Sequence, residues 1–511
     1  MVEDGILYIN NYIFLYVVSI AIKMLLENRP PYSFIAWLTV LVFLPYIGVI
    51  FYIFLGMDWK KSKKKISAKL PEDMIKNYFS SLLKEQIKIL DNMQGNYGKH
   101  INLVKLAIKS GYSPITVQNE VYVFDEGDKL FDAIIQDLKL AEKTIHMEYF
   151  IWRSDKLGNR IKDVLINKAK QGVEIRLIFD GVGSLKRISR KYRKELKANG
   201  IKFLYYHDPF SILWTRFVNY RNHRKIVVVD GVVAYMGGMN MGQEYIDGGK
   251  RFNSWKDVHM RIVGDSCNLI QNVFVCDWYN AGGRDLEIFN IEENKHKHFK
   301  KIKYVNKELN EEKVSIIRKD LFPQSFTDKF LPVQIITSGA DSKWDSIQKV
   351  YSKMIEEAKE SIYIESPYFV PDDGFLRTLE NAALSEVNVN LMITGNPDKL
   401  VAWWVAQTYF ETLLNAGVNI YLYEKGFLHS KFCVMDGRIV SCGTCNMDIR
   451  SFYLHYEMNA VIYDIDIAKK FEDIFKKDML DSHKITIEEY SKQPMLVRLR
   501  NSACRIIAPV L

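Results

Sequence analysis

The 511-residue chain contains a long internal repeat, and no other feature limits its possible folds so tightly. The segment HRKIVVVDGVVAYMGGMN at 223–240 returns as HSKFCVMDGRIVSCGTCN at 429–446. Two earlier segments recur in the same order, TIHMEYFIW (144–152) as SIYIESPYF (361–369) and NGIKFLYY (199–206) as AGVNIYLY (416–423). The repeated unit is much longer than the roughly 20–50 residues of a solenoid repeat, so we interpret it as a duplicated domain.

Each copy alternates helical and extended patterns. In the first copy, helix-like spacing at Leu130–Leu140 and Ile161–Lys170 alternates with strand-like runs at Ile145–Ile151 and Val173–Phe179. This alternation is typical of βαβ units with a largely parallel sheet. Each copy ends in a predicted hairpin with an Asp-Gly turn. The sequence therefore predicts an α/β fold with two tandem βα domains and mixed sheets.

Both copies carry the pattern His-x-Lys-x-x-x-x-Asp, followed ten residues later by an asparagine. The residues are His223, Lys225, Asp230 and Asn240 in the first copy and His429, Lys431, Asp436 and Asn446 in the second. The chain has only 10 histidines, so two matches at corresponding places of a duplication are not a product of chance.

The spacing has a chemical use. Residues two apart on a strand point to the same face, so the histidine and lysine of each motif project together. If the two copies meet at these strands, one imidazole can attack a phosphodiester phosphorus while the other donates a proton to the leaving alkoxide. The two lysines and two asparagines can hold the nonbridging oxygens. The sequence thus predicts an active site at the interface between the copies.

Each histidine needs a group that holds its other ring nitrogen. Glu148 and Glu365, on matched strands, are the predicted partners. For the motif aspartates, the alternative to a catalytic role is to brace the hairpin. His455 and Glu457 follow the second motif closely, and we expect them to support the site structurally.

Two hydrophobic segments open the chain, Ile6–Leu26 and Phe34–Leu55. At about 1.5 Å per residue each is long enough to span a bilayer, so they predict a two-helix transmembrane hairpin. The lysines that follow lie on the cytoplasmic side by the positive-inside rule, and they can contact anionic lipids. They are Lys60, Lys61, Lys63, Lys64 and Lys65. We therefore predict a multi-pass protein of the cell membrane with its catalytic domains in the cytoplasm.

These features divide the chain into six parts. We expect a membrane hairpin at 1–58, a lysine-rich connector at 59–115, the first copy at 116–290, a charged linker at 291–330, the second copy at 331–490 and an amphipathic tail at 491–511. The tail mixes Arg498, Arg500 and Arg505 with apolar residues, so both an interfacial helix and a helix packed on the domain fit it.

Composition adds exclusions. Six cysteines in 511 residues imply no disulfide framework, and Cys442-x-x-Cys445 lacks the second ligand pair that a zinc site needs. The net charge of +9 permits nucleic-acid binding, but the predicted membrane segments argue against a nuclease and favour a lipid substrate.

The doubled motif resembles the phospholipase D superfamily, and NMDIRS at 446–451, with the two hydrophobic segments and lysine-rich junction, is similar to bacterial cardiolipin synthases. The resemblance implies tandem phospholipase D-like domains without cofactor or metal. It implies phosphatidyl transfer between two phosphatidylglycerol molecules with release of glycerol through a phosphohistidine. By the same resemblance His223 is the nucleophile and His429 the acid/base, although the reverse also fits. Hydrolysis or transfer to another alcohol is the alternative. Cys445 stands where the family commonly has alanine, a residue of similar size.

Overall fold

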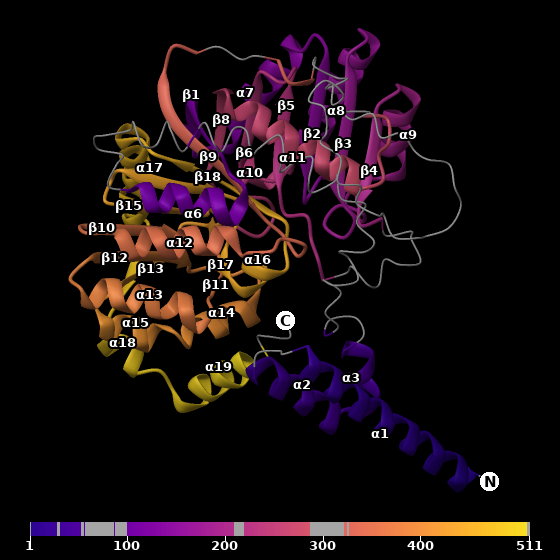
Figure 1. Cartoon of the computed structure of the whole chain (residues 1–511), viewed down its shortest axis with the longest axis vertical. Coiled ribbons are helices and arrows are strands. Elements are labelled where there is room, and N and C mark those ends of the chain that lie inside the picture. The colour runs from indigo at the N-terminus through magenta and orange to yellow at the C-terminus, as the bar shows by residue number, and fades with distance from the viewer. Residues whose placement is uncertain are drawn as a thin grey trace, which may run out of the picture.

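The computed structural model describes residues 2–27, 31–52, 56, 86, 100–208, 219–286, 321–323 and 327–507 (Figure 1). Two predicted parts lie mostly outside the described residues. They are the 59–115 connector, with its lysine run, and the 291–330 linker.

Three helices open the chain, α1 (Val2–Leu26), α2 (Pro31–Phe43) and α3 (Pro45–Phe51). The prediction of one unbroken helix from residue 34 to 55 is wrong, because the chain leaves helical geometry at Leu44, where φ is −132°. Pro45 explains the break, since proline disfavours the helical conformation in the residue before it. Within the described part of the chain, no helix combines the length and apolar character needed to cross a membrane.

The first copy follows helix α6 (Ile101–Gly111). Its elements are β1 (Ile115–Phe124), α7 (Gly127–Leu140), β2 (Thr144–Tyr149), α8 (Lys156–Lys170), β3 (Glu174–Asp180), α9 (Arg190–Ala198), β4 (Lys202–Tyr206), β5 (Lys225–Val229), β6 (Val233–Gly237), α10 (Glu244–Asp247), β7 (Trp255–Lys256), β8 (His259–Gly264) and α11 (Ser266–Asn280). The predicted helices and strands of this copy are confirmed as α7, β2, α8 and β3. Helix α7 forms because Leu130, Ile134 and Leu138 recur at helical spacing and bury one face.

The second copy repeats this order with additions. Its elements are β9 (Phe330–Ser338), α12 (Ser346–Glu357), β10 (Ser361–Glu365), β11 (Phe369–Val370), α13 (Asp373–Leu384), β12 (Asn388–Thr394), α14 (Leu400–Gln407), α15 (Phe410–Ala416), β13 (Asn419–Tyr423), β14 (Phe427–Leu428), β15 (Phe432–Met435), β16 (Ile439–Gly443), β17 (Met447–Asp448), α16 (Ile449–Tyr453), β18 (Glu457–Ile462), α17 (Ile465–Met479), β19 (Ser482–Ile485), α18 (Ile487–Ser491) and α19 (Met495–Ile507).

The strands of both copies join into one 15-stranded sheet, ordered β19-β13-β12-β10-β15-β16-β18-β9-β1-β8-β6-β5-β2-β3-β4. The antiparallel pair β9 and β1 lies at the junction of the two halves. Counted outward from this pair, the order β18-β16-β15-β10-β12-β13 in one half matches β8-β6-β5-β2-β3-β4 in the other, as duplication requires. Within this sheet, parallel pairing is confined to β2-β3-β4 and β10-β12-β13, and two separate two-stranded sheets, β11-β17 and β14-β7, are also parallel. The mixed sheet is thus confirmed, whereas the expectation of a largely parallel sheet is wrong. The hairpin and the strands that follow it add antiparallel pairs in each half.

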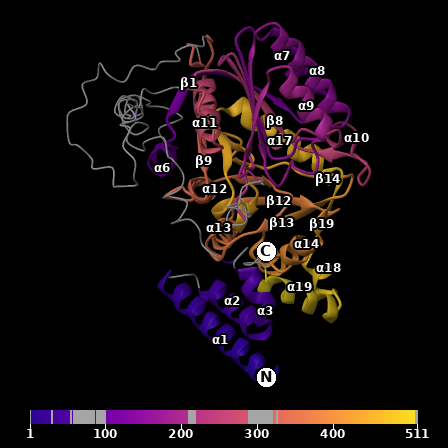
Figure 2. The same ribbon diagram turned by 90° about the vertical axis from the view of Figure 1, so that its right-hand side faces the viewer.

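The two copies share a core. Phe274 of α11 and Phe471 and Phe475 of α17 belong to one buried cluster with strand residues from both halves. Helices α7, α8 and α9 cover the other face of the first half, and α12, α13 and α15 cover that of the second (Figures 1 and 2). Because one continuous core crosses the β9–β1 junction, the copies are held rigidly against each other, with the strands of the repeated motif in the middle.

Each repeated hairpin turns at its Asp-Gly pair, as predicted. Asp230 and Gly231 have φ of 52° and 71°, and Asp436 and Gly437 have φ of 52° and 58°. Positive φ at both central residues is the geometry of a type I′ turn, which suits the twist of paired strands.

Candidate active site

The two motif histidines stand at the beginning of matched strands near the middle of the sheet. His223 lies just before β5 and His429 just before β15, and each is only 7% exposed. The lysine two residues later points to the same face in both copies. Lys225 Nζ donates to the carbonyl of His223 at 2.5 Å, and Lys431 donates to the carbonyl of His429.

Backbone hydrogen bonds fasten each histidine to the opposite copy. The His223 amide donates to the Tyr456 carbonyl at 2.9 Å, and the His429 amide donates to the Lys256 carbonyl at 2.7 Å. The residue before each histidine also pairs with the same partner, through an isolated bridge in one case and β14–β7 in the other. These matched contacts place the two motifs face to face across the junction of the copies.

Each imidazole is oriented by a carboxylate from the other copy. His223 Nδ1 lies 3.0 Å from Glu457 Oε2 and 3.1 Å from the Thr444 carbonyl. His429 Nδ1 lies 2.6 Å from Asp257 Oδ2. A carboxylate accepts a hydrogen bond from Nδ1–H, which favours the tautomer in which Nε2 carries a lone pair. In both imidazoles Nε2 is therefore the atom that can attack phosphorus or exchange a proton.

The motif asparagines and several rings complete the surroundings. Asn240 donates to the Tyr245 hydroxyl at 3.1 Å, and that hydroxyl lies 3.3 Å from His429 Nδ1. Asn446 is buried and donates to the Ser451 hydroxyl at 3.2 Å. The Phe150 ring packs edge-on against His223 at 5.0 Å. Such walls limit water at the imidazoles.

The four motif bases influence one another electrostatically. Burial, followed by Lys225 and Lys431, lowers the pKa of His223 well below its ordinary value. Burial, followed by Lys431 and Lys225, does the same to His429. Burial lowers the pKa of Lys225 to about 7 and that of Lys431 to about 8. Cations from both copies thus crowd one buried volume, which favours the binding of an anion.

Comparisons with known proteins agree with this geometry. The family model described as "Cardiolipin synthase, PLD-like domain" matches residues 134–252 and 351–479, and the models for phospholipase D and for the phospholipase D-nuclease N-terminal region match 239–393 and 13–56. The cardiolipin synthase of Alkalihalophilus pseudofirmus is 37% identical, over 97% of this chain and 92% of its own length. The major cardiolipin synthase of Bacillus subtilis is 36% identical, over 95% of each chain. This chain belongs to the cardiolipin synthase family of phospholipase D-like proteins.

A solved structure outside that family shows the same fold. The phosphatidylserine synthase of Haemophilus influenzae superposes with a TM-score of 0.57 at 15% identity, covering 80% of this chain and all of its own. The predicted tandem phospholipase D-like architecture is therefore confirmed.

One prediction about the site is wrong, because Glu148 and Glu365 do not hydrogen-bond to the histidines. Glu148 accepts from the Asn222 amide in a buried cluster with Arg224 and Asp277. Burial and then Asp277 raise its pKa well above the ordinary value, and burial and then Asp478 do the same to Glu365. Both strands run beside the motif strands, but Glu457 and Asp257, not these glutamates, lie at the Nδ1 atoms of the histidines.

The motif aspartates also lie away from the histidines. Asp230 accepts backbone amides of residues 142, 143 and 144 at 2.7–2.8 Å, and Asp436 accepts those of 359, 360 and 361. Strand β5 separates Asp230 from His223 by roughly 20 Å at about 3.3 Å per residue. The structure therefore favours the role of hairpin brace over the catalytic role.

Asp257 was missed in the sequence, and Glu457 was assigned only general support. One signal could have found both. Gly237 pairs with His259 and Gly443 with Asn459, so each acid stands two residues before a matched position on the strand that follows the hairpin. A search for acids at equivalent places in the two copies would therefore have identified this pair.

Other singled-out residues are structural. The Cys442 and Cys445 thiols are fully buried, and burial raises the pKa of each well above its ordinary value, so both are packing residues rather than thiolates. The predicted support by His455 is consistent with its ring lying 5.9 Å from that of His223.

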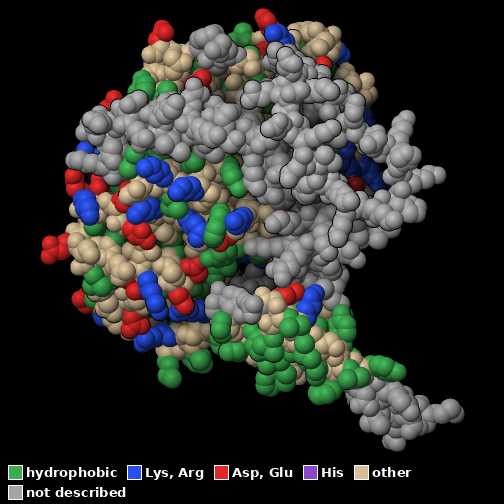
Figure 3. Space-filling model, viewed as in Figure 1, with side chains coloured by type: hydrophobic (Ala, Val, Ile, Leu, Met, Phe, Trp, Pro, Cys, Tyr) green, Lys and Arg blue, Asp and Glu red, His purple; other side chains and the backbone are tan. Residues whose placement is uncertain are grey.

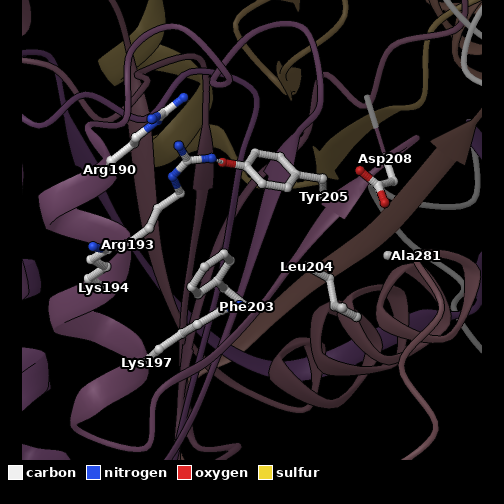
Figure 4. A pocket seen from close by; sticks show the side chains of 9 residues that line it. All are labelled: Arg190, Arg193, Lys194, Lys197, Phe203, Leu204, Tyr205, Asp208 and Ala281. Atoms are coloured by element: carbon white, nitrogen blue, oxygen red, sulfur yellow. Dashed lines mark hydrogen bonds between the residues drawn. The ribbon is translucent and has the colours of Figure 1, made fainter. Parts of the chain in front are cut away.

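A cavity of about 470 Å³ lies apart from the motif, between helix α9 and the edge strand β4 (Figure 4). It is lined by Arg190, Arg193, Lys194, Lys197, Phe203, Leu204, Tyr205, Asp208 and Ala281. None of the motif residues is among them, so this cavity is separate from the candidate site.

Proposed function

We propose that this protein makes cardiolipin by transferring a phosphatidyl group from one phosphatidylglycerol to another, with release of glycerol. The observation that carries the proposal is the pair of buried imidazoles, each held at Nδ1 by a carboxylate of the opposite copy. Relatives 36–37% identical over nearly the whole chain are cardiolipin synthases, which supports the same substrate.

The first half-reaction forms a covalent adduct. His223 Nε2 attacks the phosphorus of the donor lipid, a P–N bond forms, and the P–O bond to glycerol breaks. His429 gives its proton to the departing glycerol oxygen. The depressed pKa of His223 keeps it neutral and nucleophilic near pH 7.

The second half-reaction reverses these roles. His429 takes the proton of a glycerol hydroxyl on the second phosphatidylglycerol, and the resulting oxygen attacks the phosphorus. The P–N bond breaks, cardiolipin leaves, and His223 is regenerated. The two histidines have matched surroundings, so their assignment rests on the family resemblance and is itself open to test.

The remaining motif residues stabilise charge. We assign Lys225, Lys431, Asn240 and Asn446 to the nonbridging oxygens, whose negative charge grows in the transition state. The phosphate in turn raises the pKa of both lysines and of His429, because an anion nearby favours their charged forms. Bound substrate therefore favours the protonated form of His429, which acts as the acid.

The central test uses detergent-purified protein, phosphatidylglycerol and a chelator. Cardiolipin and free glycerol should appear in equal amounts, with no loss of rate from the chelator. His223→Ala and His429→Ala should each reduce the rate by orders of magnitude. Phosphatidic acid as main product would instead indicate a hydrolase, and a different phosphatidyl ester formed with added alcohol would indicate a general transphosphatidylase.

A trapping experiment assigns the nucleophile. A short incubation with labelled phosphatidylglycerol, rapid alkaline denaturation and peptide mass spectrometry should locate the phosphatidyl group on His223. An adduct on His429 would exchange the two roles, and the absence of any adduct would contradict the covalent mechanism.

We further propose that helices α1–α3 attach the protein to the cell membrane, with Ile6–Leu26 and Phe34–Leu55 as its bilayer segments and the catalytic domains in the cytoplasm. Their side chains are unusually exposed for apolar residues, including Phe43 at 78% and Leu26 at 78%. Hydrophobic side chains gather over α2 and α3 in Figure 3. Contiguous apolar surface of this kind marks a membrane or protein contact.

Fractionation tests this attachment. The full chain should stay with membranes after alkaline carbonate washing, and a cysteine placed in the catalytic domains should resist labelling by an impermeant reagent added to intact cells. Release by carbonate, or labelling from outside, would contradict the attachment or the orientation respectively.

A further inference from the structure

Helix α19 packs on the second copy through a narrow inner stripe. Val497, Asn501 and Cys504 recur at helical spacing and are the least exposed residues of the helix. Asn501 is buried and donates to Gln407 Oε1 of α14 at 3.1 Å. Cys504 packs against the core of the second copy. One face of α19 therefore has its partner in the domain.

The opposite face of α19 is exposed and, apart from Ser502, apolar. Met495, Leu499 and Ile506 are 84%, 63% and 64% exposed, and Leu496 is 78% exposed. With 3.6 residues per turn, the first three lie within roughly 40° of one another and about opposite the inner stripe. A helix that only packs on a soluble domain carries polar residues on this face.

Arginines flank this apolar stripe on both sides. The Arg500 guanidinium lies over the Trp404 ring at 4.4 Å, and that of Arg505 lies over the Tyr409 ring at 4.5 Å. Arg498 lies on the same flank as Arg505, 3.3 Å from a glutamate of α15. An outward apolar stripe between cations is the pattern of a helix that lies in a membrane interface.

The position of α19 agrees with this pattern. Figures 1 and 2, which view the molecule from directions 90° apart, both place α19 at the end where α1–α3 lie. Those helices carry the exposed apolar residues already described. The apolar stripe of α19 therefore continues a hydrophobic end of the molecule rather than standing alone.

We propose that α19 docks on the surface of an anionic bilayer, with its apolar stripe among the acyl chains and its arginines at the lipid phosphates. The proposal extends the proposed function, since it rests on a lipid substrate. Its consequence is the placement of α14, which lies against the inner face of α19. That helix begins directly after Lys399, whose charge reaches both catalytic histidines. Docking thus sets the height of the active site above the lipid phosphates.

A fluorescent probe tests the docking itself. The full chain, with the two partly exposed cysteines Cys276 and Cys504 replaced by serine, receives an environment-sensitive dye at Leu499→Cys. The matched control carries the dye at Leu480→Cys, because Leu480 is 87% exposed and directly follows α17, a helix that lies far from α19 in Figure 1. Transfer from detergent to vesicles of phosphatidylglycerol and phosphatidylcholine should shift the emission to the blue at 499 and not at 480. Equal spectra at the two positions would overturn the proposal.

Activity provides a second arm. Leu496→Glu combined with Leu499→Glu should lower cardiolipin formation in proteoliposomes by at least about tenfold, because two charges then oppose insertion. In detergent micelles the same variant should stay within about twofold of the parent chain, and Leu480→Glu should behave normally in both. Equal activity of the double variant in both settings would refute the docking. If the parent chain makes no cardiolipin in either setting, the proposed function fails, whereas the probe still decides the docking.

Discussion

The carboxylates that reach across the copies provide the sharpest test of the mechanism. Glu457→Gln and Asp257→Asn keep the size of each side chain but remove its charge. A hydrogen bond to a charged group is worth about 1.5–3 kcal/mol, or roughly 10–150-fold in rate. The amide can also turn its NH₂ group toward Nδ1, which moves the ring proton to Nε2 and blocks the attacking atom. We therefore expect a loss of about 10²–10⁴-fold for each variant, as for the aspartate of a serine-protease triad.

The two variants should fail at different steps. Glu457→Gln disables His223, so labelled phosphatidylglycerol should leave no adduct on the protein. Asp257→Asn disables His429, so glycerol leaves slowly and any adduct that forms is discharged slowly. The assay is cardiolipin formation in detergent micelles with single-turnover trapping, and thermal unfolding of each variant checks that the fold is intact.

Glu148→Gln and Glu365→Gln are the matched controls. Burial first, and then a neighbouring aspartate, raise the pKa of both carboxyls well above the ordinary value, which favours their protonated forms. Glutamine closely resembles a protonated glutamate, and we expect activity within about threefold of the parent chain. The reasoning is refuted if these controls abolish transfer while Glu457→Gln and Asp257→Asn leave it intact.

Three further predictions concern pH, the hairpins and the acceptor. Because burial lowers the pKa of Lys225 to about 7 and that of Lys431 to about 8, kcat/KM should fall as pH rises through 7–8, far below the ordinary lysine pKa of 10.5. Bound phosphate favours the charged lysines, so kcat should fall at a higher pH than kcat/KM does. If kcat and kcat/KM fell at the same pH, the result would count against these pKa values. Asp230→Asn and Asp436→Asn should each cost about 1–3 kcal/mol in unfolding free energy while the folded fraction keeps its activity, because each carboxylate binds three backbone amides remote from the histidines. Lys399→Gln should raise KM for phosphatidylglycerol and increase hydrolysis relative to transfer, since this exposed cation, whose charge acts on both histidines, suits the phosphate of the second lipid. An unchanged product ratio would contradict this.

The sequence predicted the parts of the fold that local pattern determines. Helical spacing gave α7 and α8, and the Asp-Gly pairs gave both hairpins, because these depend on neighbouring residues alone. The repeat also predicted that the two motifs meet. It did not predict the break at Leu44, although Pro45 is in the sequence, because an uncharged hydrophobic run of this length is typical of one continuous span.

The pairing of histidine with carboxylate depends on tertiary structure. Glu148 and Glu365 are the candidates that the sequence offers because they occupy matched strands of the two copies, and the structure places both strands beside the motif strands. Neighbouring strands of one sheet place side chains on a common face. The histidine rings nevertheless contact the opposite copy, where Glu457 and Asp257 bind their Nδ1 atoms. A pattern within one copy cannot show which residue of the other copy faces it, so the partners needed the structure.

A buried ion pair is present in each half of the duplication. In the first half Arg224, directly after the motif histidine, binds Asp277 at 2.5 Å, and its guanidinium lies over the Tyr456 ring at 5.6 Å. In the second half Ser430 follows the motif histidine instead, and Lys256 from the first copy binds Asp478 at 3.2 Å. Each half thus has one buried cation paired with its buried acid. The cation comes from the motif segment in the first half (Arg224) and from the opposite copy in the second (Lys256). Its position is required because unpaired buried acids would be costly, whereas its source is free to change because the copies lie in one chain. The same reasoning explains why each motif imidazole could come to depend on the opposite copy, and it follows that neither half contains the whole candidate site.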